Sequence, residues 1–124
     1  MFSDQFFYAG WLMGDMYNIS RGIRDVATSQ FSFDEHYTDT VIQIIKEDNL
    51  RIFNRVYLEK FKDRDGNFNI IVFNDNGKEK AKRIIELFSQ PFPENISSYH
   101  RELGMLFGYS VEKIDEFINS WIEK

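Results

Sequence analysis

The sequence predicts a single α+β domain, residues 1–124, in which an antiparallel β-hairpin packs against about five to six helices. Two runs rich in β-branched and aromatic residues, at about 50–61 and 67–73, flank an Asp-Gly turn. This pattern is a strong short-range signal for a hairpin. Apolar residues recur at helical spacing before and after the two runs. The length of 124 residues also fits one domain.

Three helices are expected before the hairpin. The first covers about 3–18, and a short second helix covers about 20–29. A third helix is expected over about 32–48, because Ser32 and Glu35 have the spacing of a capping box.

The two strands of the hairpin differ in pattern. In the first strand one face is apolar, and the other carries Arg51, Phe53, Arg55 and Tyr57. The second strand is apolar on both faces, so it is expected to be covered on both sides or to lie at an interface. A lone two-stranded ribbon is marginally stable, so helices must cover it. A third strand, or a strand of a partner, is the other possibility.

Three further helices are expected after the hairpin. One covers about 78–90 and ends at a proline-containing linker. The next begins at Ser97 or Ser98 and ends at Gly108, a residue type that favours the left-handed conformation found after helices. Ser110 is expected to cap the last helix.

Composition excludes several kinds of site. The chain has no Cys, which removes disulfides, thiolate metal sites and Cys nucleophiles. A net charge of −5 argues against a nucleic-acid partner. The N-terminal segment lacks the basic region of a signal peptide, and no stretch approaches the ~20 apolar residues of a membrane span. We therefore expect a cytoplasmic protein.

Two acidic segments have some features of metal sites. A calcium loop with Gly66 at its sixth position would need carboxylates where Phe61 and Val72 stand, so we interpret this segment as a turn. Glu35, His36 and Asp39 bring three potential ligands to one helix start, but the chain has only one other His to complete such a site. We expect no metal, no cofactor and no catalytic residue, and a solvated acidic turn at this helix start.

A locally basic helix follows the second strand of the hairpin. Gly77 and Lys78 could present a backbone N–H group and an ammonium group to a phosphate. Lys80, Lys82 and Arg83 extend the positive charge. A solvated helix face is the first interpretation of this pattern, and an anion-binding site is the alternative.

Arginine and aromatic residues alternate on one face of the first hairpin strand. If exposed, these side chains suit the recognition of a protein surface, because Arg and Tyr are frequent among interface hot spots. If a helix covers them, the aromatic rings belong to the core. The predicted protein-binding residues are Arg51, Phe53, Arg55, Tyr57, Tyr99, His100 and Tyr109.

The segment His100–Ile118 reads HRELGMLFGYSVEKIDEFI. It resembles the H-E-x-G-x-x-L-G-Y-P segment of a family of uncharacterised bacterial proteins, in which one helix turns into another. Arg101 is inserted between the His and the Glu, and Ser110 stands where that family has Pro. The family has no established activity. The residues themselves predict a helical corner in which Gly104 allows close packing and Tyr109 fills the turn.

The first functional hypothesis is a small non-enzymatic protein that binds another macromolecule. A compact acidic chain rich in Phe, Ile, Asn and Lys fits an AT-rich genome, so a phage or mobile-element inhibitor of a host enzyme or defence complex, acting in the bacterial cytoplasm, is one form of this hypothesis. One alternative is a small-molecule-binding protein or enzyme with a pocket between hairpin and helices, using His36, His100, Arg51 and Arg55. A second is nucleic-acid binding through these arginines and residues 78–83.

Self-association is a separate expectation. The second hairpin strand is apolar on both faces, and the first helix is rich in aromatic residues. Together they suggest a homodimer. Gly10 and Gly14 in that helix are expected to let another backbone approach closely.

Overall fold

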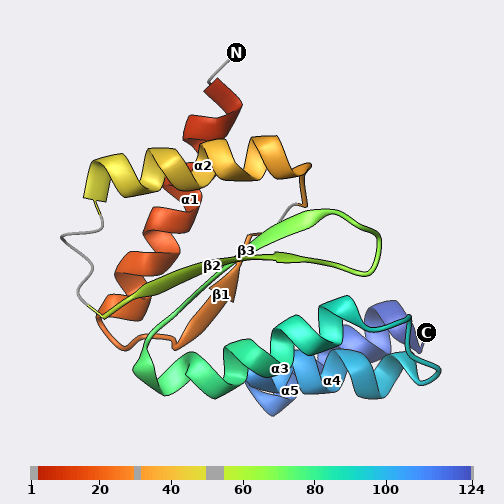
Figure 1. Cartoon of the computed structure of the whole chain (residues 1–124). Helices are drawn as coiled ribbons and strands as arrows, with labels where there is room; N and C mark the ends of the chain where they lie inside the picture. The colour runs from red at the N-terminus through yellow and green to blue at the C-terminus, as the bar shows by residue number, and fades with distance from the viewer. Residues whose placement is uncertain (1–2, 30–31, 50–54, 124) are drawn as a thin grey trace.

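The computed structural model describes residues 3–29, 32–49 and 55–123, and within them it confirms an α+β fold with one three-stranded antiparallel sheet (Figure 1). In chain order the elements are α1 (Ser3–Ser20), β1 (Val26–Thr28), α2 (Glu35–Asn49), β2 (Tyr57–Lys62), β3 (Phe68–Phe73), η1 (Asp75–Gly77), α3 (Lys78–Ser89), α4 (Ile96–Leu106), α5 (Val111–Phe117) and η2 (Ile118–Ile122).

The sheet has the order β1-β3-β2, so the second hairpin strand is its centre. Phe73 pairs with Val26 of β1 on one side and with Tyr57 of β2 on the other. The predicted hairpin is therefore present, and the third strand that was left open comes from the chain itself. At the hairpin turn Gly66 has a φ of +83°, a left-handed conformation that Gly adopts at little cost.

Helices cover both faces of the sheet (Figure 1). α1 and α2 pack on one face, where Met16, Ile45 and Ile70 belong to one buried cluster. α3 and α4 pack on the other face, where Ile71 and Ile84 belong to a second cluster. Two helical layers thus explain why β3 is apolar on both faces, and no interface is needed to account for it.

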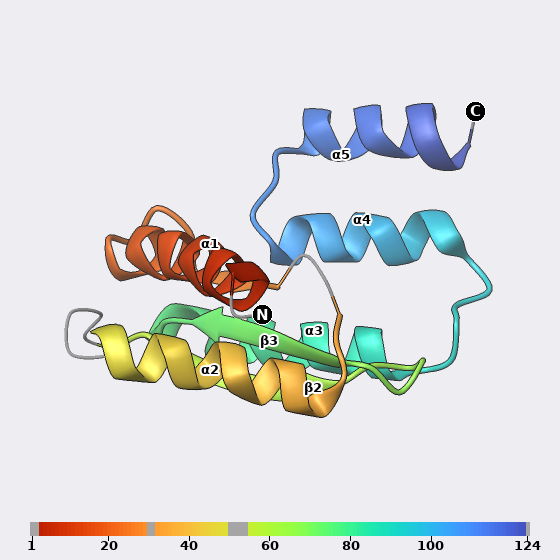
Figure 2. The ribbon, with the colours of Figure 1, turned by 90° about the horizontal axis from the view of Figure 1, so that it is seen from above.

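The C-terminal helices extend past one edge of the sheet. Seen from above, α4 and α5 lie on the side of the sheet away from β2 (Figure 2). α5 and η2 pack on α4. Gly104 makes this contact possible, as predicted, because a Cβ at this position would lie 2.7 Å from Ile114 Cγ1. Residues of α4, α5 and β1 line one cavity at this edge of the sheet.

The expected second helix is wrong: residues 26–28 form β1 instead. α1 continues to Ser20, and Gly22, with a φ of +74°, then turns the chain. Val26 and Ala27 are buried on opposite faces of the sheet, in the two different clusters. Pairing with the apolar central strand buries both side chains at once, which outweighs the weak local preference for a helix.

The predicted start of the third helix is also wrong. Asp34, and not Ser32, caps α2, because its carboxylate accepts a hydrogen bond of 2.8 Å from the Tyr37 backbone N–H. Phe33 was expected on the helix, but it forms an isolated antiparallel bridge with Phe68. The helix therefore starts later because the preceding residue extends the sheet.

The first hairpin strand is shorter than predicted. Residues 50–54 lie outside the described residues, and the ladder begins at Tyr57. Arg55 has a φ of 63°, which is a left-handed conformation and not an extended one. The predicted alternation is therefore interrupted before it reaches β2.

The helix ends near the C-terminus follow the sequence closely. Gly108 has a φ of +86° after α4, and the Ser110 hydroxyl accepts from the Lys113 backbone N–H at 3.3 Å, as predicted. The start of α4 differs, because the Asn95 side chain caps it by accepting from Ser98 N–H at 3.0 Å. Tyr109 does not fill the corner, since 55% of its surface is exposed.

The two glycines of α1 do not serve a close contact within the described chain. A Cβ added at Gly10 or Gly14 would meet no atom within 4 Å. The expectation that these glycines allow close packing inside the chain is therefore wrong. The homodimer stays a prediction, and because helices cover both faces of β3, only the aromatic residues of α1 still suggest it. None of the helices in the described ranges has both the length and the apolar content of a membrane span.

Candidate binding site at the β1 edge of the sheet

The outer edge of β1 presents backbone hydrogen-bonding groups. Asn74 N–H donates to the Asp25 carbonyl at 3.1 Å, and Ser29 N–H donates to the Ile70 carbonyl at 2.8 Å. In an antiparallel ladder every second residue bonds to the neighbouring strand. Val26 and Thr28 therefore direct their N–H and C=O groups away from β3, and no other described residue forms a strand beyond them.

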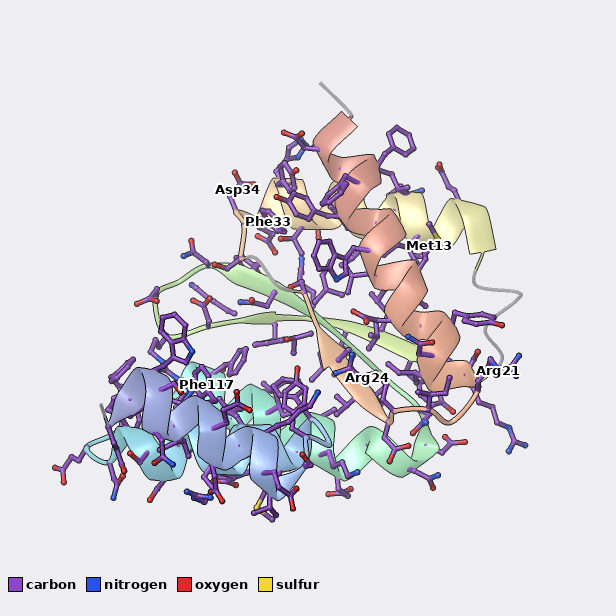
Figure 3. All side chains as sticks on the ribbon, turned by 180° about the vertical axis from the view of Figure 1, so that it is seen from behind. Met13, Arg21, Arg24, Phe33, Asp34 and Phe117 are labelled. Atoms are coloured by element: carbon purple, nitrogen blue, oxygen red, sulfur yellow. The ribbon has the colours of Figure 1, made fainter. Side chains whose placement is uncertain are left out.

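A cavity of about 640 Å³ lies against this edge. Figure 3 looks onto it: β1 lies between α1 and α5, with Arg24 beside the strand and Phe117 on α5. Two stretches far apart in sequence supply most of the lining, namely residues 15–32 and the α4–α5 segment, and β3 and α3 contribute Asn69 and Phe88. The lining includes Asp15, Arg24, Ala27, Thr28, Ser29, His100, Leu103, Phe107, Tyr109, Lys113, Ile114 and Phe117.

The wall formed by α4 and α5 is mainly apolar. Leu103, Ile114 and Phe117 contribute hydrocarbon surface, and the His100 ring stands edge-on to the Phe117 ring at a centroid distance of 5.4 Å. Burial lowers the pKa of His100 below its ordinary value, because a low-dielectric surrounding disfavours the imidazolium. These surroundings favour the neutral imidazole, which has one N–H donor and one acceptor nitrogen.

The opposite wall carries an ion pair. Arg24 Nη1 lies 3.4 Å from Asp15 Oδ1, and the two side chains are 29% and 15% exposed. Burial raises the pKa of Asp15, and the nearby Arg24 only partly offsets this effect. The guanidinium has five N–H donors, so this single long contact leaves most of its donor capacity toward the cavity.

The charged lining of the cavity differs in sign from the whole protein. Arg24 and Lys113 supply two positive charges against one negative charge from Asp15, while His100 is neutral. The whole chain has a net charge of −5. Lys113 has no ion-pair partner among the described residues. The cavity therefore has a local excess of positive charge and an apolar wall, which together suit a ligand with both acidic and apolar groups.

The described members of the predicted protein-binding group lie on different elements of the fold. Arg51 and Phe53 lie outside the described residues. Arg55 and Tyr57 lie at the start of β2, the other edge strand, where the Tyr57 hydroxyl donates to Asp75 at 2.8 Å. Tyr99 accepts a hydrogen bond of 2.7 Å from the Arg64 guanidinium.

Two of the predicted residues do meet in the cavity. His100 and Tyr109 both line it. They come from the segment that resembles the uncharacterised family, and they line the same cavity as Ala27 and Thr28 of β1. The other cavity residues were not predicted as a site.

The predicted anion-binding residues are largely engaged in other contacts. Lys80 pairs with Asp25 at 3.1 Å, and Lys82 pairs with Glu79 at 3.4 Å. The Gly77 N–H donates to the Asn74 side chain at 2.9 Å, so it is not directed at a ligand.

Arg83, the last basic residue of the group, binds Glu102 through two contacts of 2.6 and 3.0 Å. These contacts raise the pKa of Arg83 and lower that of Glu102. Only Lys78 of the predicted cations has no ion pair in the described chain. The anion site stays a prediction, and the geometry favours a charged surface with internal pairs.

The acidic segments also have internal partners. Lys60 Nζ donates to Glu35 and to Asp39, both at 2.8 Å. The Asp63 carboxylate accepts from the backbone N–H groups of Asp65 and Asn67, at 3.0 and 3.1 Å. All three carboxylates thus have partners within the fold, and we assign no ligand to any of them.

Sequence reasoning missed Asp15, Arg24 and Thr28 for one reason. The expected helix over 20–29 concealed the edge strand, so residues on either side of it were not brought together. A usable signal was present in Gly22 and the β-branched residues Val26 and Thr28, which favour a turn followed by a strand.

No family model, curated protein or solved structure matches the chain. The resemblance of His100–Ile118 to an uncharacterised family therefore stays a prediction.

Proposed function

We propose that this protein binds another protein by taking up an extended segment of it as a fourth strand beside β1. The single observation that supports this proposal is the outward backbone edge of β1, where Ala27 and Thr28 line a cavity. In strand addition the main-chain hydrogen bonds supply affinity, and pockets for alternate side chains supply specificity. Both elements are available at this edge.

The side chains of an added strand would alternate between two surroundings. Ala27 packs in the cluster under α1 and α2, whereas Val26 packs in the cluster under α3 and α4. A neighbouring strand repeats this alternation, because successive side chains point to opposite faces. One set of partner side chains would face the α1 wall with Asp15 and Arg24, and the other would face the apolar wall of α4 and α5.

The length of β1 limits the contact. A strand of 3 residues spans about 10 Å at roughly 3.3 Å per residue. Few main-chain hydrogen bonds fit along it, so the side chains in the cavity must supply much of the affinity. This favours recognition of a short linear segment, which suits an inhibitor or an adaptor. The predicted role of a phage or mobile-element protein that blocks a host enzyme is one form of this proposal.

A small-molecule ligand is the second candidate. The volume of about 640 Å³ lies within the usual range for such pockets, roughly 300–1,000 Å³. The neutral His100 and the Asp15–Arg24 pair would then be the polar groups that orient the ligand. A small molecule would need the cavity but not the backbone groups of β1. A variant that changes only those backbone groups therefore distinguishes the two candidates.

A proline substitution tests the use of the backbone edge. Peptides selected from a random library on the purified protein provide the probe, and fluorescence anisotropy measures their dissociation constants. Thr28→Pro removes an N–H group that points away from β3, so no bond within the sheet is lost. Proline is tolerated at such a position of an edge strand. We expect about tenfold weaker peptide binding from the lost main-chain bond and the added ring.

Two matched variants control for folding and position. Thr28→Val keeps both the N–H group and the β-branched shape, so peptide binding should stay unchanged. Lys62→Pro places the same substitution at an outward position of β2 and should also leave binding unchanged. Equal losses in Thr28→Pro and Lys62→Pro, or no loss in either, would contradict strand addition at β1.

A further inference from the structure

We infer that the segment taken up beside β1 is acidic, with a carboxylate that binds Arg24 and a neighbouring apolar side chain that packs on α4 and α5. This inference rests on the proposed function and names the chemistry of the partner. It follows from three observations on the residues that line the cavity.

The first observation is the contrast between Arg24 and the best-paired arginine of the protein. Arg83 holds Glu102 by two contacts, of 2.6 and 3.0 Å, in the bidentate geometry that guanidinium groups prefer for carboxylates. Arg24 reaches Asp15 by one atom at 3.4 Å. Its remaining donors can therefore bind a second carboxylate, and that carboxylate can have the better geometry.

The second observation is the local charge. Arg24, from the loop after α1, and Lys113, from α5, both line the cavity. Lys113 has no carboxylate partner within the described ranges. Lys60, Lys80 and Arg101 each have one or more such partners. An acidic segment in the cavity would thus meet two cations in a protein that is otherwise acidic. A basic segment would add to the positive charge instead.

The third observation is the apolar wall. Phe107, Ile114 and Phe117 line the cavity from the end of α4 and from α5. Figure 3 shows Phe117 on α5, apart from Arg24 beside β1. Adjacent residues of an added strand point to opposite faces. A segment in which acidic and apolar residues alternate therefore satisfies both walls at once.

Asp15 is a competitor for the same guanidinium. It occupies one donor of Arg24 while its own carboxylate is largely buried. Replacing it with Asn keeps the size and the hydrogen-bonding capacity but removes the competing charge. Asp15→Asn should therefore bind an acidic segment severalfold more tightly, a result that a purely structural role of Arg24 would not produce.

The experiment uses three hexapeptides with blocked ends and a common pattern. They are Ser-Val-Glu-Val-Glu-Ser, the same peptide with Gln in place of Glu, and the same peptide with Lys in place of Glu. Two-dimensional NMR titration of the labelled full chain measures even weak dissociation constants. We expect the Glu peptide to bind most tightly and the Lys peptide most weakly, with the largest shifts at the Thr28 amide.

Variants identify the cation that recognises the acid. Arg24→Gln should weaken binding of the Glu peptide by about tenfold and leave binding of the Gln peptide unchanged, as expected for loss of a charge-assisted hydrogen bond. Arg24→Glu should reverse the order of the Glu and Lys peptides. Lys46→Gln, at a cation of α2 outside the cavity and outside the predicted anion site, is the matched control and should change neither.

The outcomes separate this inference from the proposed function. The Glu, Gln and Lys peptides could bind with equal dissociation constants, shift the Thr28 amide signal and bind more weakly to Thr28→Pro. That result would overturn the acidic preference, while strand addition stands. Free glutarate is the test for a small-anion site. If it binds at Arg24 with the dissociation constant of the Glu peptide, and if Thr28→Pro does not weaken its binding, both the acidic preference and strand addition are wrong. Absence of shifts at Thr28 with every peptide would also overturn both.

Discussion

The two edges of the sheet are built differently. β2 is a strand of 6 residues that carries Glu59, Lys60 and Lys62. Its outward positions include both lysines, because Tyr57, Glu59 and Phe61 are the residues that bond to β3. β1 is a strand of 3 residues without a charge, and it lies at the base of a cavity.

The difference indicates which edge is suited to pairing. Charged residues on an edge strand, lysine above all, prevent another chain from adding to it. Lys60 is further held in place by Glu35 and Asp39. β1 has no charged residue in its own sequence, and residues of α4 and α5 line the cavity beside it. The β2 edge therefore carries charges that disfavour pairing, whereas the β1 edge carries none and lies beside a cavity.

The largest effect is expected where β1 is anchored. A Cβ at Gly77 would lie closer than any normal contact to the Asp25 carbonyl, which accepts from Asn74 at the start of β1. Gly77→Ala should therefore lower the free energy of unfolding by about 3 kcal/mol.

Urea denaturation measures this change, and Gly10→Ala is the matched control. Gly10 has open space around it, so alanine there should stabilise α1 by about 1 kcal/mol. Similar changes in both variants would show that the anchor of β1 is not tightly packed.

A smaller effect is expected when the charge on β2 is removed. Lys60→Thr puts a β-branched, neutral residue at an outward position of this edge. We expect concentration-dependent self-association of this variant, measured by analytical ultracentrifugation, because the unprotected strand can pair with a second copy. Lys46→Thr, on α2, should behave like the parent protein. A monomeric Lys60→Thr variant would mean that the charge does not guard this edge.

Two aspartates beside β1 should respond to pH in opposite directions. Hydrogen bonds from Asn74 and Lys80 lower the pKa of Asp25 below 3.8, so its stabilising contribution is present at pH 7 and is lost as the pH falls through the lowered value. Burial raises the pKa of Asp15 above 3.8, so the folded state binds its proton more readily and gains relative stability as the pH falls through the raised value.

Asparagine variants test these signs by urea denaturation at pH 7 and pH 3. Asp25→Asn should be less stable than the parent protein at pH 7, with a smaller difference at pH 3. Asp15→Asn should be at least as stable as the parent at pH 7 and should lose that advantage at pH 3. The same pH dependence in both variants would contradict the opposite environments assigned to the two carboxylates.

The smallest effect is expected on the outer face of α3, away from either edge. Lys82 and Glu79 form an ion pair with 63% and 83% of their side chains exposed. Lys82→Ala should leave both the urea midpoint and peptide binding unchanged within error, because exposed ion pairs add little to stability. A loss of peptide binding in this variant would favour the predicted anion site on α3 over the cavity at β1.

The sequence predicted the parts of the fold that depend on strong local patterns. The hairpin, the cap at Ser110 and the turn at Gly108 each have a signal within a few residues. β1 could not be predicted with the same ease, because three residues carry little pattern and their strand conformation depends on pairing with a distant segment.

The candidate site was mostly beyond sequence reasoning for a related reason. Its residues come from α1, the loop after it, β1, α4 and α5, which only the fold brings together. His100 and Tyr109 were predicted as binding residues, and both line the cavity. Arg24 lacked any local signal, because its position beside Asp15 depends on where α1 ends and β1 begins.

Amide hydrogen exchange in the presence of a bound peptide tests strand addition most directly. A library-selected peptide is added to the labelled full chain, and exchange rates are compared at Thr28 of β1 and at Lys60 and Lys62 of β2. Strand addition should slow exchange at Thr28 and leave exchange at both lysines unchanged, because only the β1 edge gains main-chain bonds. Slower exchange at Lys60 and Lys62, or unchanged exchange at Thr28 with the peptide bound, would contradict it.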